Sequence, residues 1–108
     1  MPGYFLNGYS IPDLLKLLGV ERGESIRLEV GYEPSLTIKG KDFEIEGPVV
    51  EEEAAEELLR TVASTREMRI FRQRGTIDII HTFRDSRFLV RAVRAFSDFR
   101  LELHALKS

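Results

Sequence analysis

Hydrophobic and polar residues alternate with a period of two along the C-terminal part of the chain. Residues 87–105 contain two such runs on either side of Ser97-Asp98, and this pattern predicts an antiparallel β-hairpin with a two-residue turn. A turn at that position pairs Phe96 with Phe99. The alternation collects one apolar face, formed by Phe88, Val90, Ala92, Phe96, Phe99, Leu101 and Leu103. We therefore expect a hairpin that is covered on this face and open on the other.

The remaining elements are predicted from the same kinds of periodicity. Alternation predicts strands at residues 24–30 and 76–83, and two more strands in the region between residues 35 and 46. Apolar stripes at helical spacing predict helices at 50–63 and 64–75, the second of which begins with a capping box. A short helix is predicted from an N-cap at Ser10 to Gly19, after a strand or arm at 1–10. The predicted order is helix, three strands, two helices, three strands.

This order is typical of an α+β fold. We expect a mostly antiparallel sheet of about five to six strands, with two to three helices on one face. A chain of 108 residues forms one domain and buries roughly 65% of its unfolded surface. Within this single compact domain, residues 1–22 are expected to form an N-terminal arm and short helix, and residues 23–108 the α+β unit.

The composition argues against several classes of protein. The chain has no cysteine, which excludes disulfides and thiolate zinc sites and fits a reducing compartment. No basic start and apolar core precede residue 10, and no apolar run approaches the roughly 20 residues of a membrane span. We expect a soluble cytoplasmic protein without membrane insertion, cofactor or metal.

Charge is distributed unevenly along the chain. Residues 1–57 carry a net charge of −8 and residues 58–108 a net charge of +6, which together give −2. Ten of the eleven basic residues in the second half are arginines, whose planar fork binds carboxylates and phosphates well. Either the acidic half neutralises the basic half within the fold, or the arginines line a surface for a partner or a phosphate. The candidate contact residues are Arg69, Arg72, Arg87, Arg91, Arg94 and Arg100. Arg94 falls on the covered face of the hairpin, from which we expect it to extend into water.

The sequence offers no catalytic residues. A P-loop around Lys41 would need glycine where Ser35 stands and a serine or threonine where Asp42 stands. His81 and His104 have no neighbours in a spacing typical of nucleophilic catalysis. We expect the glutamates of the helix at 50–63 to form a solvated face, not a metal site. A pI of 5.7 and the absence of a recognition motif argue against nucleic-acid binding.

Four segments in order resemble one protein family. Residues 23–28 (GESIRL) stand where that family reads A-S-D-I-H-L, and residues 31–40 (GYEPSLTIKG) match the spacing of its G-x-x-P-x-x-R-I-D-G segment. The helix ending at Gly75 and residues 76–78 resemble its E-T-G-E-L-D-F passage, and residues 87–91 (RFLVR) resemble its R-F-R-V-N strand. From residue 23 to about residue 105, the chain resembles the N-terminal domain of PilT/GspE-type ATPases, the hexameric motors of type IV pili and type II secretion.

The resemblance implies a PAS-like α+β fold. In the hexamers this domain packs on a neighbour's ATPase domain and supplies basic groups near the nucleotide, for which Arg87 and Arg94 are the matching residues. The chain departs from the family motifs at Ser25, Arg27, Thr37, Lys39 and Leu89. The ATPase half, with its Walker motifs, is absent from these residues, so we expect no ATP hydrolysis by this chain alone.

Together these expectations favour a non-catalytic protein-interaction or regulatory module that acts in twitching motility or secretion. Its partner would be a hexameric pilus or secretion ATPase or a second copy of the chain. Two alternatives stay open. The chain can be an excised N-terminal fragment of a full-length hexameric ATPase, or a PAS-like sensor of a small ligand.

Overall fold

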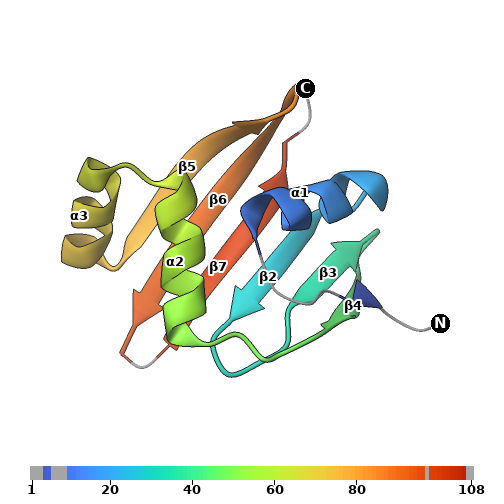
Figure 1. Cartoon of the computed structure of the whole chain (residues 1–108), viewed down its shortest axis with the longest axis horizontal. Coiled ribbons are helices and arrows are strands. Elements are labelled where there is room, and N and C mark those ends of the chain that lie inside the picture. The colour runs from blue at the N-terminus through green and yellow to red at the C-terminus, as the bar shows by residue number, and fades with distance from the viewer. Residues whose placement is uncertain (1–3, 6–9, 97, 107–108) are drawn as a thin grey trace.

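Seven strands form one sheet, and three helices lie on one of its faces, in the part of the chain that the structure describes (Figure 1). The structure is a computed structural model that describes residues 4–5, 10–96 and 98–106. The elements in chain order are β1 (Tyr4–Phe5), α1 (Ile11–Val20), β2 (Ser25–Glu29), β3 (Ser35–Ile38), β4 (Lys41–Glu46), α2 (Glu52–Val62), α3 (Thr65–Arg74), β5 (Thr76–Phe83), β6 (Ser86–Ala95) and β7 (Asp98–Ala105). Of the strand or arm predicted at 1–10, residues 1–3 and 6–9 lie outside the described residues.

The strand order in the sheet is β1-β4-β3-β2-β7-β6-β5. Strands β2 to β7 pair antiparallel with their neighbours, and the two-residue β1 adds a parallel pair at the β4 edge. The expected α+β class and the mostly antiparallel sheet with its helices on one face are confirmed. Strand β2 joins the N-terminal meander to the C-terminal strands, because it pairs with both β3 and β7.

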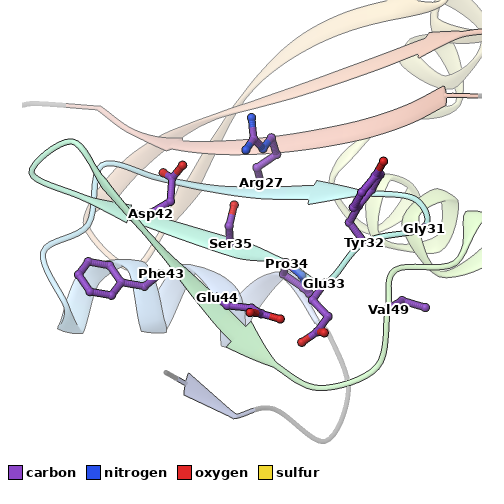
Figure 2. Close-up of a pocket in the computed structure, with 10 residues that line it drawn as sticks. All are labelled: Arg27, Gly31, Tyr32, Glu33, Pro34, Ser35, Asp42, Phe43, Glu44 and Val49. Atoms are coloured by element: carbon purple, nitrogen blue, oxygen red, sulfur yellow. The ribbon is translucent and has the colours of Figure 1, made fainter. Parts of the chain in front are cut away.

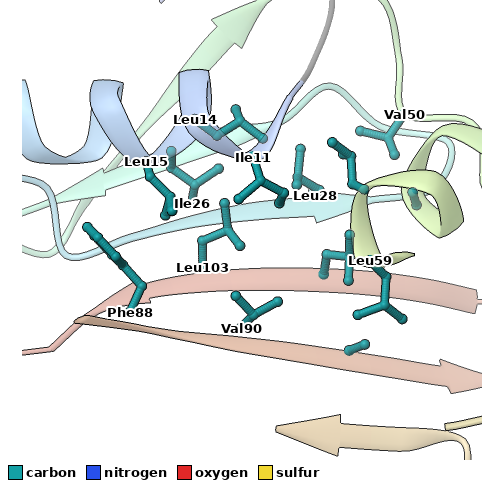
Figure 3. Close-up of a cluster of buried hydrophobic side chains, with 14 of the residues drawn as sticks. Ile11, Leu14, Leu15, Ile26, Leu28, Val50, Leu59, Phe88, Val90 and Leu103 are labelled. Carbon is teal, nitrogen blue, oxygen red and sulfur yellow. The ribbon is translucent and has the colours of Figure 1, made fainter. Parts of the chain in front are cut away.

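The hydrophobic core lies between the helices and one face of the sheet. Figure 3 shows Ile11 and Leu15 of α1 on the same side of the sheet as Ile26 of β2, Val90 of β6 and Leu103 of β7. All five side chains are at most 2% exposed. Each fully buried Leu, Ile or Val contributes roughly 1.5–3 kcal/mol through removal of apolar surface from water. This layer therefore fixes which face of each strand points inward.

Local signals set the start of α1 and both ends of α3 as predicted. The predicted end of the first helix at Gly19 is wrong, because α1 continues to Val20 and is capped at Glu21. The Ser10 side chain accepts a hydrogen bond from the Asp13 N–H at the start of α1. Ser64 and Glu67 form the predicted capping box of α3, with bonds of 3.1 and 2.8 Å. Helix α3 ends at Gly75, which adopts a left-handed conformation with φ of 78°.

Helix α2 begins at Glu52, two residues later than predicted. Val50 forms an isolated parallel bridge with Val30 and exchanges hydrogen bonds with the Gly31 N–H and the Tyr32 carbonyl. Because its backbone groups are engaged with the β2–β3 loop, Val50 cannot start the helix. Its side chain is nevertheless buried, with 1% exposed.

The register of the C-terminal hairpin differs from the predicted one by two residues. Arg94 pairs with Phe99, and the last pair is Ala95 with Asp98. The predicted pair of Phe96 with Phe99 is therefore wrong, and Ser97 of the predicted turn lies outside the described residues. A shift of two residues keeps each paired side chain on its predicted face, because side chains alternate with a period of two. Phe96 alone leaves the apolar face, and it is fully exposed.

We expect Gly75→Ala to destabilise the protein by about 1–2 kcal/mol. An added Cβ at this left-handed position would lie 2.8 Å from the Arg94 carbonyl oxygen, which is backbone and cannot move aside cheaply. Chemical denaturation measures the loss. The matched control is Gly19→Ala in α1, where no atom lies within 4 Å of the added Cβ. This control should keep or raise stability, since alanine favours helix. Equal losses of stability in the two variants would contradict the contact with the Arg94 carbonyl oxygen as the cause.

Candidate interaction surface

The face of the sheet that points away from the helices is polar and uncovered. We call it the open face. Its side chains come from six neighbouring strands, and none of them is buried. The open face consists of Ser25, Arg27, Glu29, Ser35, Thr37, Asp42, Glu44, Glu46, Thr76, Asp78, Ile80, Thr82, Arg87, Leu89, Arg91, Val93, Arg100, Glu102 and His104. It follows directly from the alternation in the sequence, because the apolar partners of these residues face the core.

A row of charges crosses the open face perpendicular to the strands. Each residue of the row is the cross-strand partner of the next, which places neighbouring side chains about 4.5–5.5 Å apart at Cβ. The row reads Glu44, Ser35, Arg27, Glu102, Arg91 and Asp78 from β4 to β5. Opposite charges alternate along most of it. We call it the charged row.

Arg91 and Asp78 form the best-defined ion pair of the charged row. Arg91 donates two hydrogen bonds to the Asp78 carboxylate, from Nε at 2.8 Å and from Nη2 at 3.2 Å. The hydrogen bond from Arg91, and then its charge, hold the pKa of Asp78 below its usual value. This bidentate geometry fixes both side chains on the open face.

Glu102 contacts two side chains of its own strand, Arg100 and His104. Its Oε2 lies 2.9 Å from Arg100 Nε, and its Oε1 lies 2.9 Å from His104 Nε2. The Arg100 contact is an ion pair without an aligned hydrogen bond, since Arg100 Nε has no hydrogen-bond partner among the described residues. The His104 side chain is half-buried. Arg100 and Arg91 are thus both paired within the chain.

Two arginines of the open face remain without an ion pair among the described residues. Arg27 and Arg87 are exposed, and each presents a full guanidinium fork to solvent. Arg87 belongs to the predicted contact set, whereas Arg27 was left out of it. The alternation at 24–30 does place Arg27 on the outer face, so the signal was present in the sequence. What the sequence lacked was the strand order that brings Arg27 next to the hairpin.

Arg94 lies on the helix side of the sheet and is held by the chain itself. Its guanidinium carbon stands 4.5 Å from the centre of the Phe99 ring and 5.4 Å from that of Phe71. Its Nη2 is 3.5 Å from Glu52 and 3.7 Å from Glu56 of α2. Two of its nitrogens are buried without a hydrogen-bond partner among the described residues. Arg94 therefore packs against α2, α3 and β7, and with 32% of its side chain exposed it extends into water only in part.

Arg69 and Arg72 are exposed on α3, away from the open face. Helix α3 packs on β5 from the core side of the sheet. The predicted contact set is thus divided by the structure. Arg87, Arg91 and Arg100 share the open face, whereas Arg69 and Arg72 share a helix on the other side, and Arg94 lies half-buried on the helix side of the sheet.

The β3–β4 end of the open face is acidic and hollowed. A shallow groove of about 500 Å³ lies there. Figure 2 shows Arg27, Ser35 and Asp42 pointing to the same side of the sheet along this groove. A side-chain hydrogen bond with Glu44, and then burial and the charges of Glu44 and Glu46, raise the pKa of Glu33. The groove therefore combines one unpaired guanidinium with a cluster of carboxylates.

No group of three or more His, Cys, Asp or Glu residues within the described part of the chain is arranged to hold a metal ion. None of the helices at 11–20, 52–62 and 65–74 is long and apolar enough to cross a membrane.

Solved structures share this fold. No protein-family model matches the chain, and no curated protein matches it in sequence. The ATPase DotB of Legionella pneumophila matches 98% of this chain and 32% of its own, at 13% identity and a TM-score of 0.81. The pilus retraction motor PilT, solved with bound ADP, matches 93% of this chain and 30% of its own, at 20% identity and a TM-score of 0.81. The DotB of Yersinia pseudotuberculosis matches 99% of this chain and 33% of its own, at 11% identity and a TM-score of 0.68.

These similarities establish the fold. The resemblance to the N-terminal domain of PilT-type ATPases, predicted from four short motifs, is confirmed at this level. The chain spans about a third of the length of each of these ATPases. The region shared with them is therefore one domain of larger motors, and similarity at 11–20% identity extends no further than the arrangement of the elements.

We expect Asp78→Asn to lower stability at neutral pH by less than about 1 kcal/mol, because the Arg91–Asp78 pair is exposed. The folded-state pKa of Asp78 lies below the ordinary value of 3.8, so its contribution is complete above that pH. It is lost as the pH falls through the lowered folded-state pKa. Urea denaturation of both proteins over this range measures the difference.

Asp85→Asn is the matched control, since Asp85 makes no ion pair with any described residue. A gap between wild type and Asp78→Asn that stays constant far below pH 3.8 would disprove the proposed origin of the shift.

Proposed function

We propose that this chain is a non-catalytic protein-interaction module of type IV pilus or secretion machinery, acting in twitching motility or secretion. Its docking surface is the open face, and its partner is a hexameric motor ATPase. The observation that supports this most is the uncovered charged row, which contains the unpaired Arg27 and shares the open face with the unpaired Arg87, on the fold that PilT and DotB contain.

The arrangement of charges favours a protein partner of acidic surface. Arg27 and Arg87 are exposed, and a guanidinium fork binds carboxylates in a bidentate manner. The ion pairs of the open face, Arg91 with Asp78 and Arg100 with Glu102, hold their side chains in fixed places. Fixed alternating charges determine the register of docking more than its strength, whereas unpaired charges accelerate encounter.

A second candidate function is that these residues form part of a full-length ATPase. The supporting observation is that the two DotB structures and the PilT structure each extend over about three times the length matched here. In that case the open face would contact a neighbouring domain of the same hexamer. The coding sequence after residue 108 distinguishes the two: a downstream Walker motif supports the longer ATPase, and a stop codon supports the separate module.

We expect the double variant Arg27→Glu, Arg87→Glu to bind the pilus or secretion ATPase of the same genome at least about tenfold more weakly than wild type. Both residues lack ion partners among the described residues, so their reversal breaks no observed contact within the chain. Circular dichroism should therefore show an unchanged fold. Biolayer interferometry at two salt concentrations measures the affinity, and the loss should shrink at high salt.

The matched control is Arg66→Glu, which makes the same change on the first turn of α3, where a negative charge suits the helix dipole. A further variant, Arg69→Glu with Arg72→Glu, tests the arginine surface of α3. Binding that is lost in the α3 variant but kept in the open-face variant would move the docking surface to α3. Unchanged binding in all variants would reject the proposal.

A further inference from the structure

Phe96 is an aromatic knob at the tip of the β6–β7 hairpin. Its side chain is 105% exposed, and its backbone has a φ of 56°, a left-handed value that bulky residues rarely adopt. Neither property stabilises the monomer, because the ring gains no contact and the backbone is strained. Five other large apolar side chains of the described residues also exceed 38% exposure, but none exceeds 69%. Phe96 therefore has the geometry of an anchor for a partner.

A pocket of matching character lies at the opposite end of the sheet. It has a volume of about 250 Å³ and lies between the C-terminal end of α1 and the β5–β6 turn. Its floor is apolar, and two cations stand at its rim. It is lined by the buried Leu15 and Phe88, the half-buried Phe83, and the exposed Lys16, Gly19, Val20, Arg84 and Ser86. We call it the α1 pocket.

Size and charge both fit one aromatic side chain with an acidic neighbour. The pocket is smaller than the roughly 300–1,000 Å³ typical of sites for small molecules. The Phe96 ring is followed by the exposed Asp98, and the rim carries Lys16 and Arg84, so the charges are complementary. The Arg84 guanidinium lies 5.1 Å from the centre of the Phe83 ring and covers one of its faces. The rest of the Phe83 ring can contact a second aromatic ring.

Knob and pocket cannot meet within one molecule. Strand β6 has ten residues and separates the β5–β6 turn from the hairpin tip, a distance of about 30 Å at 3.3 Å per residue. Figure 1 shows these two ends of β6 on opposite sides of the molecule. A second copy of the chain, however, presents the α1 pocket to the Phe96 of the first.

We propose that the chain associates with itself head to tail, with Phe96 of one copy inserted into the α1 pocket of the next. Because the two surfaces differ, the contact is heterologous and leaves a free knob at one end and a free pocket at the other. Copies therefore add in a row or close into a ring. Phe96 and the α1 pocket lie outside the open face, and of the contact residues only Asp98, at the start of β7, is on its side of the sheet. The variants below change neither Asp98 nor the arginines of the open face, so failure of this contact can be distinguished from failure of docking to an ATPase.

Two single variants separate the two surfaces. Phe96→Asn removes the ring, and asparagine tolerates the left-handed backbone. Gly19→Leu places a side chain at the mouth of the α1 pocket, where an added Cβ meets no atom within 4 Å. Both variants should remain folded. Sedimentation velocity across a concentration series should show reversible association of wild type, and at least tenfold weaker association of each variant.

Mixing the two variants gives the decisive result. Phe96→Asn keeps an intact pocket, and Gly19→Leu keeps an intact knob, so an equimolar mixture should form one-to-one dimers that grow no further. The matched control is Tyr32→Ala, which removes an aromatic side chain that is 64% exposed outside both surfaces and should associate as wild type does.

Three results would overturn the proposal. The first is a wild type that stays monomeric at the highest soluble concentration, which would assign the pocket to another protein's side chain. The second is wild-type association without dimers in the mixture of variants, which would show an interface other than knob and pocket. The third is an equal loss of association in Tyr32→Ala, which would show non-specific hydrophobic contact.

Discussion

Burial of one face of the sheet against α1, α2 and α3 is the interaction on which the rest of this structure depends. The strands at its centre, β2, β7 and β6, contribute Leu28, Leu101 and Val90, which are fully buried. Since helices cover only that face, every second residue of the same strands must face water. The open face is therefore a direct consequence of a core that lies on only one side of the sheet. Its polar character needs no separate explanation, but its pattern of charges does.

The uneven charge of the two halves of the chain is only partly neutralised by folding. Arg94 of the basic half lies near Glu52 and Glu56 of the acidic half, as an internal neutralisation requires. Arg91 and Arg100 instead pair within the basic half. Arg60 of the basic half also pairs with Glu56 of the acidic half, whereas Arg27, Arg69, Arg72 and Arg87 form no ion pair with described residues. Both interpretations of the charge pattern thus describe part of the molecule. The unpaired arginines are distributed over two faces, and only a partner can distinguish which face is used.

The similarity to PilT and DotB shows how little sequence this fold requires. Although only 13–20% of the residues are identical, the helices and strands of this chain superpose on those of DotB and PilT with a TM-score of 0.81. Many different residues can form an alternating apolar pattern, a helix cap or a turn, so the fold does not require a particular sequence. Contacts with a partner are less tolerant, since they depend on particular side chains. This explains why the fold is shared while the motif positions of this chain differ at Ser25, Arg27 and Leu89. Function must accordingly be argued from the surfaces, and not from the fold.

The sequence by itself determined the order of the elements, the caps at Ser10 and Ser64, and the face of each strand that points inward. These features depend on residues close in the chain, through hydrogen bonds within a turn and through periodicity. Tertiary structure decided which strands are neighbours, so Arg27 joined the charged row unexpectedly. It also decided the hairpin register that excludes Phe96 from the core, and the place of Arg94 against the rings of Phe71 and Phe99. Periodicity identifies a face but not a partner, because a shift of two residues preserves the pattern while it changes every contact.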